Sequence, residues 1–150
     1  MTPGTRDDVA RRLSAVVVRV TRSIRPMHGE LSGGHYATLA TVQRFGPQRP
    51  SDLARSERVS APTMTRIVAV LEERGLVTRR QSAQDLRSVT VDITPEGDRL
   101  VARVRAEQAE ALAGLLSALD DEQVGAIAGA LDALDALARE AVGAPASARR

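Results

Sequence analysis

The chain contains 150 residues, of which 43% are hydrophobic and 27% charged, so it is long enough for one compact domain or one elongated protomer of an oligomer. It has no cysteine and only two aromatic residues, Tyr36 and Phe45, which excludes thiol catalysis, disulfides and cysteine-ligated metals and nearly excludes sites built from stacked rings. Its formal net charge of +2 is too small to indicate a polyanionic partner unless the charges are unevenly distributed.

The first predicted element is an amphipathic helix over residues 7–25, which Pro26 ends. Its apolar residues recur at helical spacing: Val9, Leu13, Val16, Val17, Val20 and Ile24. Ser32 then stands at an N-cap position before a short apolar-periodic run that ends at residues 45–47. The N-terminal part is therefore predicted to consist of two helices.

Two further helices joined by a tight turn are predicted next. Residues 50–52 open a short helix that reaches about Glu57, and Ser60 caps a longer helix over residues 61–74. Gly75 occupies the C′ position, which takes a positive φ. Two helices of this kind form a helix-turn-helix pattern.

The hydrophobic pattern then changes from helical to β. Residues 76–80 and 89–93 are rich in β-branched side chains and flank a polar segment, residues 82–88. This order predicts a hairpin that serves as a wing beside the helix-turn-helix. Thr94 caps the next helix, with Pro95 at its first position.

The C-terminal part is predicted to contain two long helices. One has its apolar stripe over residues 100–119, and the other begins at Asp120 and Gln123, which have capping-box spacing. Their apolar stripes and many alanines favour close helix packing between subunits. Residues 143–150 have nothing to bury, so we expect a disordered tail.

Charge is distributed unevenly over these elements. Residues 44–105 carry 12 arginines against 8 acidic residues, whereas residues 106–142 carry one arginine against 8. A basic middle joined to an acidic end is expected when one part of a chain meets a polyanion. The sequence thus predicts a mainly α fold with a winged helix-turn-helix DNA-binding region over residues 31–97 and dimerisation helices over residues 6–30 and 98–142.

The helix that follows Ser60 is expected to enter a DNA major groove with its N-terminal turns. The expected contacts come from short side chains and one arginine: Ser60, Ala61, Pro62, Thr63, Thr65 and Arg66. Arg66 alone among them can make a bidentate contact to guanine, worth about 1–3 kcal/mol of discrimination. Two alternatives stay open for Arg66, a phosphate contact and a solvated surface charge.

The wing supplies a second set of expected contacts. Arg87 suits the minor groove, and Asp85 stands two residues before it, where it can hold the guanidinium. The alternative is an ordinary turn ion pair, worth well under ~1 kcal/mol. Phosphate contacts are expected from flanking residues, with exposed charge as the alternative: Ser51, Arg55, Arg79 and Arg80.

Several motifs occur together in a characteristic order: Leu53-Ala54, the run from Val59 to Arg66, the run from Leu71 to Val77, Asp-x-Arg at 85–87 and Thr-x-x-Gly at 94–97. With this combination the span 31–97 resembles the multiple-antibiotic-resistance regulator (MarR) family. The resemblance implies a homodimer with interlocking terminal helices that binds a pseudo-palindromic operator on double-stranded DNA and usually represses transcription. It also implies release by a small effector bound between the dimerisation and DNA-binding parts.

The first helix–helix junction holds the residues expected to bind such an effector: Arg25, His28, His35 and Tyr36. They suit an acidic ligand or pH sensing through imidazole, and ordinary surface histidines are the alternative. The scarcity of aromatic residues departs from the walls that phenolic ligands usually meet. His28 and His35 lack i, i+4 spacing and further ligands, so no metal is expected.

The sequence as a whole predicts a homodimeric, sequence-specific transcriptional regulator without a cofactor. The alternative is a dimeric protein-interaction module that keeps the winged-helix fold without specific DNA binding. An enzyme is not expected, because the histidines form no triad and no glycine-rich phosphate loop is present. No apolar run approaches the roughly 20 residues that span a bilayer and residues 1–10 are polar, so we expect a cytoplasmic chain without membrane contact.

Overall fold

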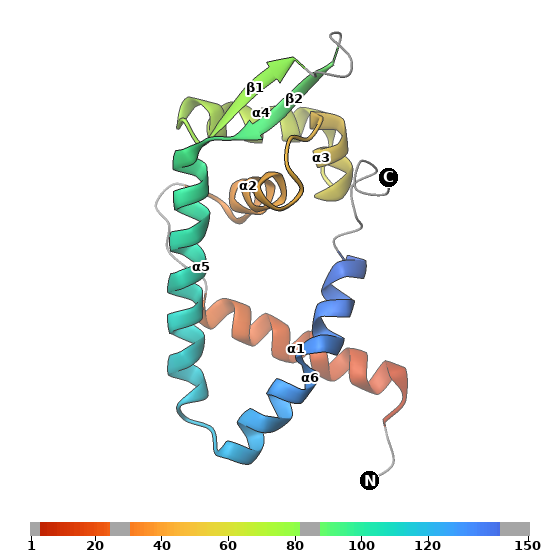
Figure 1. Cartoon of the computed structure of the whole chain (residues 1–150). Coiled ribbons are helices and arrows are strands. Elements are labelled where there is room, and N and C mark those ends of the chain that lie inside the picture. Colours follow the sequence, from red (N-terminus) through yellow and green to blue (C-terminus); the bar gives the residue numbers. More distant parts are fainter. Residues whose placement is uncertain (1–3, 25–30, 82–87, 142–150) are drawn as a thin grey trace.

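The computed structural model describes residues 4–24, 31–81 and 88–141. Within these ranges the elements follow in the order α1 (Arg6–Ser23), α2 (Gly33–Phe45), α3 (Pro50–Ser56), α4 (Ala61–Glu73), β1 (Val77–Gln81), β2 (Val89–Ile93), α5 (Pro95–Leu116) and α6 (Asp121–Ala141). Figure 1 shows α2, α3, α4 and the two strands together at one end, while α5 descends from the strands to the end that holds α1 and α6. The predicted winged helix-turn-helix and mainly α fold are confirmed.

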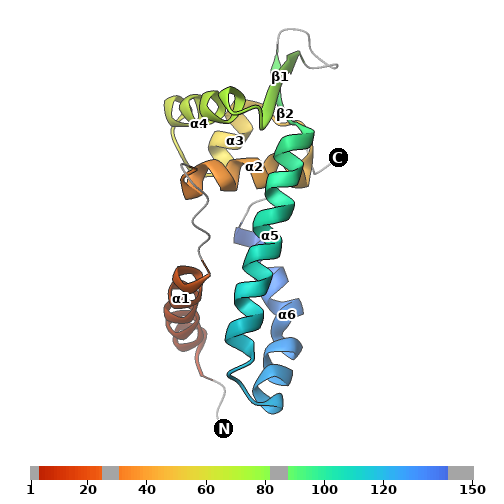
Figure 2. The same ribbon diagram turned by 90° about the vertical axis from the view of Figure 1, so that its left-hand side faces the viewer.

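The hydrophobic core lies at the winged end, where α2, α3, α4, both strands and the first half of α5 meet. Its fully buried side chains include Leu39, Leu53, Met64, Leu71, Val91 and Val101. α1 contributes no buried residue, and no residue of α6 belongs to this core among those that the structure describes. In the turned view of Figure 2, α1 and α6 lie on either side of α5.

The helix-turn-helix begins and ends where local chemistry predicts. The Ser60 hydroxyl accepts a hydrogen bond from the backbone N–H of Thr63 (3.3 Å), which caps α4. Gly75 ends the helix with φ +68°, as predicted for a C′ residue. α3 begins at Pro50, within the predicted residues 50–52, and Arg49 stands at its N-cap.

The wing is an antiparallel pair in which Val77 lies opposite Ile93 and Gln81 lies opposite Val89. β1 thus begins one residue later than the predicted 76–80. Gln48 adds a short bridge that the sequence did not indicate: its N–H donates to the carbonyl of Val91 (3.0 Å), and its carbonyl accepts from the Val91 N–H (2.7 Å). The predicted tip, residues 82–87, lies outside the described residues.

A tight junction joins the end of α4 to the start of α5. The Thr94 hydroxyl donates to the carbonyl of Gly75 (2.6 Å) and accepts from the N–H of Gly97 (3.1 Å), while the Thr94 N–H donates to the carbonyl of Leu76 (3.1 Å). A Cβ on Gly97 would lie 2.2 Å from that Leu76 carbonyl oxygen, so only glycine fits there. The recognition region and the long α5 are thereby fixed to each other.

The C-terminal helices match the predicted order. α5 starts at Pro95 behind its Thr94 cap and ends at Leu116, three residues before the end of the predicted apolar stripe. The predicted capping box is present, since the Asp120 carboxylate accepts from the N–H of Gln123 (2.8 Å) and the Gln123 side chain accepts from the N–H of Asp120 (3.2 Å). No helix within residues 4–24, 31–81 and 88–141 is long and apolar enough to cross a membrane. The predicted tail, residues 143–150, lies outside these ranges.

Candidate nucleic-acid interface

The first two turns of α4 present a polar outer face opposite a buried one. Met64, Ile67, Val68 and Leu71 face the core, because apolar residues at helical spacing share one side of the helix. The residues predicted to contact DNA bases are all exposed: Ser60, Ala61, Pro62, Thr63, Thr65 and Arg66. The structure therefore gathers all six on the solvent side of the capped helix end.

The hydroxyl groups on this face are partly engaged within the helix. The Ser60 Oγ lies 2.8 Å from Thr63 Oγ1, and the Thr65 hydroxyl donates to the carbonyl of Ala61 (3.0 Å). Because its proton is used, Thr65 offers DNA only acceptor lone pairs, which suit the amino groups of adenine and cytosine. The Arg66 side chain makes no hydrogen bond or ion pair with any other described residue, so its five guanidinium N–H donors remain available.

The arginines predicted to contact phosphates each have a carboxylate partner. Guanidinium and carboxylate atoms lie 3.3, 3.3 and 3.9 Å apart in the pairs Arg55–Asp52, Arg79–Glu72 and Arg80–Asp92. Exposed pairs of this kind contribute about 0–1 kcal/mol, so they orient the guanidinium without binding it tightly. Ser51 is exposed in the first turn of α3. No local sequence pattern indicates the Arg79 and Arg80 pairs, because each joins residues that only the fold brings together.

The wing-tip residues Asp85 and Arg87 lie outside the described residues. The pair of strands that carries them projects from the same end of the molecule as α4 (Figure 1). Arg79 and Arg80 lie on β1, and Glu72 of α4 reaches Arg79. The described part of the wing is therefore tied to the recognition helix by an ion pair.

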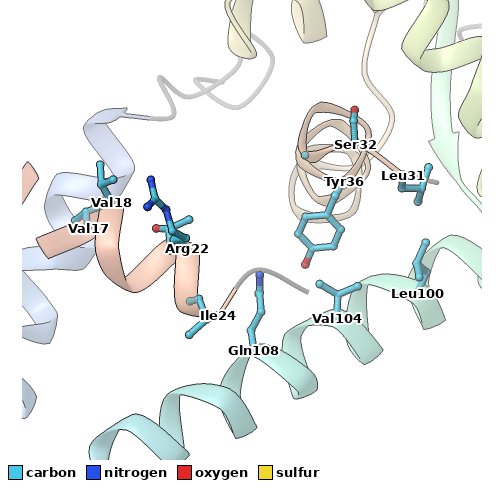
Figure 3. Close-up of a pocket in the computed structure, with 12 residues that line it drawn as sticks. Val17, Val18, Arg22, Ile24, Leu31, Ser32, Tyr36, Leu100, Val104 and Gln108 are labelled. Atoms are coloured by element: carbon cyan, nitrogen blue, oxygen red, sulfur yellow. The ribbon is translucent and has the colours of Figure 1, made fainter. Parts of the chain in front are cut away.

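A cavity of about 590 Å³ lies between α1, α2 and α5 (Figure 3). Its wall is largely aliphatic and includes Val17, Val18, Ile24, Leu31, Leu100 and Val104. Arg22, Ser32, Tyr36 and Gln108 supply polar groups, and the Tyr36 ring extends from α2 toward α5 (Figure 3). Of the residues that line the cavity, only Tyr36 is predicted from the sequence to bind an effector. The others are not predictable, because the cavity is assembled from three helices that lie far apart along the chain.

Of the other residues expected to bind an effector, Arg25 and His28 lie outside the described residues. His35 is not among the residues that line the cavity. Its Nδ1 accepts a hydrogen bond from the N–H of Ser32 (3.3 Å) and lies 2.7 Å from the Ser32 hydroxyl, so it helps to cap α2. Burial, with a smaller contribution from the charge of Arg74, lowers the pKa of His35 below its ordinary value.

Tyr36 is half-buried at the cavity wall. Burial raises the pKa of its hydroxyl, and the charge of Arg105 on α5 opposes the rise. The phenol is therefore neutral at physiological pH. Because Tyr36 of α2 and Leu100 of α5 both line the cavity, the cavity lies where the winged region meets the long helix.

Comparisons with known proteins identify relatives over most of the chain. Residues 31–89 match the family model described as "MarR family". A helix-turn-helix-type transcriptional regulator of Mycobacterium tuberculosis is 34% identical over 114 residues, which cover 75% of this chain and 80% of that protein. One of Mycobacterium leprae is 33% identical over 116 residues, covering 76% and 81% of the two chains.

Solved structures share the fold. A putative transcriptional regulator of Pseudomonas aeruginosa is 27% identical, with a TM-score of 0.77 over 91% of this chain and 99% of its own. A transcriptional regulator of Thermotoga maritima is 23% identical, with a TM-score of 0.74 over 90% and 96%. The similarity therefore extends over the terminal helices as well as the winged region.

Proposed function

The chain belongs to the MarR family of DNA-binding transcriptional regulators, and from this premise we propose that it is a homodimeric repressor of a pseudo-palindromic operator. The observation that carries the proposal is the exposed N-terminal face of α4, on which Arg66 has no partner among the described residues. A guanidinium of this kind reads guanine through the O6 and N7 atoms in the major groove. Arg66 lies in the second turn of α4, and helix-turn-helix proteins insert the N-terminal turns of this helix into DNA.

The proposed contacts divide into base contacts and phosphate contacts. The exposed face of α4 between Ser60 and Arg66 supplies the base contacts. Ser51, Arg55, Arg79 and Arg80 supply the phosphate contacts, because phosphates can displace the weakly held carboxylates from these arginines. By family resemblance Asp85 and Arg87 form the wing pair, with Arg87 in the minor groove.

A second copy of the chain accounts for the apolar surface at the other end of the molecule. Apart from Val89, all large hydrophobic residues that stay well exposed in the described ranges belong to α1, to the end of α5 with the residues after it, or to α6: Val9, Val16, Val17, Val18, Leu115, Leu119, Ile127, Leu131, Leu134 and Leu137. Ten such residues form far more apolar surface than a monomer usually leaves in water. A twofold axis through these helices would bury the same patch on both protomers.

The proposed twofold symmetry also predicts the form of the operator. Two copies of α4 related by a twofold axis enter successive major grooves about 34–36 Å apart, so the preferred site has two inverted half-sites. Residues 31–97 therefore carry the DNA contacts, and residues 6–30 and 98–142 carry dimerisation.

We place effector binding in the cavity between α1, α2 and α5. Its walls come from both the proposed dimerisation helices and the winged region, so a ligand there changes how the two parts sit against each other. A ligand releases DNA only if it binds the DNA-free arrangement more tightly than the DNA-bound one. Aliphatic walls with Arg22 and Tyr36 favour a small amphipathic molecule.

Selection of bound duplexes from a random DNA pool tests the proposal directly. We expect enrichment of an inverted repeat whose half-sites lie about one helical turn apart. Arg66→Ala should lower affinity for the enriched sequence by roughly 5–100-fold and relax the preference at one base pair per half-site. If no sequence is enriched, the chain is the alternative, an interaction module without specific DNA binding.

Sedimentation of an α6 variant tests dimerisation separately. Leu131, which is 53% exposed, lies within the apolar stripe of α6, so Leu131→Glu should yield monomers and lose cooperative binding to the two half-sites. Ala136→Glu is the matched control, because it places the same charge about 140° away around the helix. Dimers of equal stability in both variants would contradict the proposed interface.

A further inference from the structure

The turn between α3 and α4 contains an unusual backbone conformation. Arg58 has φ +54°, and it is the only non-glycine residue with a positive φ in the described ranges. A side chain clashes with the backbone in this left-handed region, so glycine or asparagine occupies it with less strain. Arginine at this position therefore needs an explanation beyond the turn itself.

Contacts within the protomer do not supply the explanation. The Arg58 side chain is exposed and makes no hydrogen bond or ion pair with any residue in the described ranges. The nearest carboxylate in sequence, that of Glu57, accepts a hydrogen bond from the Thr41 hydroxyl instead (2.7 Å). By contrast, Arg55, three residues earlier, has Asp52 as its partner.

The position of Arg58 relative to α4 indicates what it binds. It stands two residues before Ser60, the N-cap of α4, so its backbone lies within about 7 Å of the capped end. In helix-turn-helix proteins the first helix crosses the DNA backbone while the second lies in the groove. The turn that joins them (Figure 1) accordingly passes the phosphates at the edge of that groove.

We infer that Arg58 binds a DNA phosphate beside the major groove and that the strained turn presents it there. The inference rests on the proposed insertion of α4 into DNA. The contact is independent of sequence, and it sets the depth and orientation of α4 while Arg66 reads the base. A strained backbone conformation that persists without a contact in the free protein is typical of binding sites.

Three substitutions separate the charge of Arg58 from its backbone strain. Arg58→Gly removes both, Arg58→Gln removes the charge alone, and Arg58→Lys keeps the charge. Arg44→Gln, on the exposed surface of α2 and outside both the proposed DNA contacts and the proposed dimerisation helices, is the control for a general change in net charge. Affinity is measured by fluorescence anisotropy at several salt concentrations, with the duplex enriched from the random pool and with a duplex of unrelated sequence, and stability is measured by urea denaturation.

We expect Arg58→Gly and Arg58→Gln to weaken binding to both duplexes by a similar factor, on the order of tenfold at low salt. The slope of log affinity against log salt should become shallower by about 0.9 for each protomer bound, since one phosphate contact is lost. Arg58→Lys should keep most of the slope. Arg58→Gly should also raise the urea midpoint, so that stability and affinity change in opposite directions.

Other outcomes would overturn the inference. Slopes and affinities of Arg58→Gly that equal those of Arg44→Gln would show that Arg58 does not contact DNA. A loss confined to the enriched duplex would assign Arg58 to a base rather than a phosphate. If Arg66→Ala binds the enriched duplex poorly while all Arg58 variants bind it normally, only the inference about Arg58 fails. If the wild-type protein binds no duplex, the proposed function fails as well.

Discussion

Gly97 offers a direct test of how the recognition region is joined to the long α5. An alanine Cβ at this position would lie 2.2 Å from the carbonyl oxygen of Leu76 and 2.7 Å from Cγ1 of Ile93. Real Cβ atoms essentially never come closer than 3.0 Å to such atoms, so the backbone of Leu76 must move. That carbonyl also accepts the N–H of Thr94 (3.1 Å), so the movement weakens the hydrogen bond that closes the junction.

The cost of Gly97→Ala follows from these contacts. Inserting an extra methyl group into a tightly packed site costs about 1–3 kcal/mol, and the weakened hydrogen bond adds about 0.5–1.5 kcal/mol. Alanine regains at most about 1 kcal/mol as the better helix former. We therefore expect a net loss of about 0.5–4.5 kcal/mol in the free energy of unfolding, or roughly 1–18 °C in melting temperature.

Thermal and urea denaturation measure this loss, with all variants at one protomer concentration because association changes the midpoint. Gly114→Ala is the matched control. It makes the same chemical change within α5, but no atom lies within 4 Å of the added Cβ. It should therefore stabilise the protein by about 0.5–1 kcal/mol.

The two glycines should thus respond with opposite signs. If Gly97→Ala is as stable as the wild type, the backbone of Leu76 moves without cost and the reasoning is refuted. If both variants lose stability equally, the effect belongs to the helix rather than to the junction.

Three further predictions concern the capped helices and the interface. Ser60→Ala should lower the free energy of unfolding by about 1 kcal/mol, because α4 loses its cap, whereas Ser60→Gly should cost only a few tenths; urea midpoints distinguish them. Because the pKa of His35 is lowered in the folded protein, the unfolded chain binds a proton at this histidine first as the pH falls below about 6.5. The contribution of His35 to the free energy of unfolding is therefore complete above that pH and is lost on acidification. His35→Gln keeps a capping acceptor and should show a smaller fall in urea midpoint between pH 7.5 and 5.5, and an unchanged fall would exclude His35 as its source. Glu72→Gln frees Arg79 from its carboxylate and should tighten DNA binding a few-fold in anisotropy titrations with little change in stability, whereas weaker binding would mean that Glu72 positions the arginine.

Capping chemistry explains why most helix ends were predictable. Ser60, Thr94 and the Asp120–Gln123 pair each bond to backbone groups within three residues, and Gly75 takes its positive φ without help from distant contacts. The apolar face of α4 followed from spacing alone. The spacing therefore also predicts that the polar residues between Ser60 and Arg66 face solvent, as they do in the structure.

Features that join distant residues were not predictable from their local patterns. Gln48 gave no sign of pairing with Val91, and the cavity draws its walls from three separate helices. Arg58 stands in a turn that the sequence does show, but nothing local indicates that an arginine takes the left-handed conformation there.

Sequence alone determined the order of the helices and strands, the winged helix-turn-helix and the surface of α4 that meets solvent. Each depends on periodicity and on hydrogen bonds that span three or four residues. Tertiary structure alone decided which carboxylates hold Arg79 and Arg80, where the cavity opens and why Gly97 must lack a side chain. These depend on distances between segments that the chain connects only through its whole fold, and no local pattern encodes such distances.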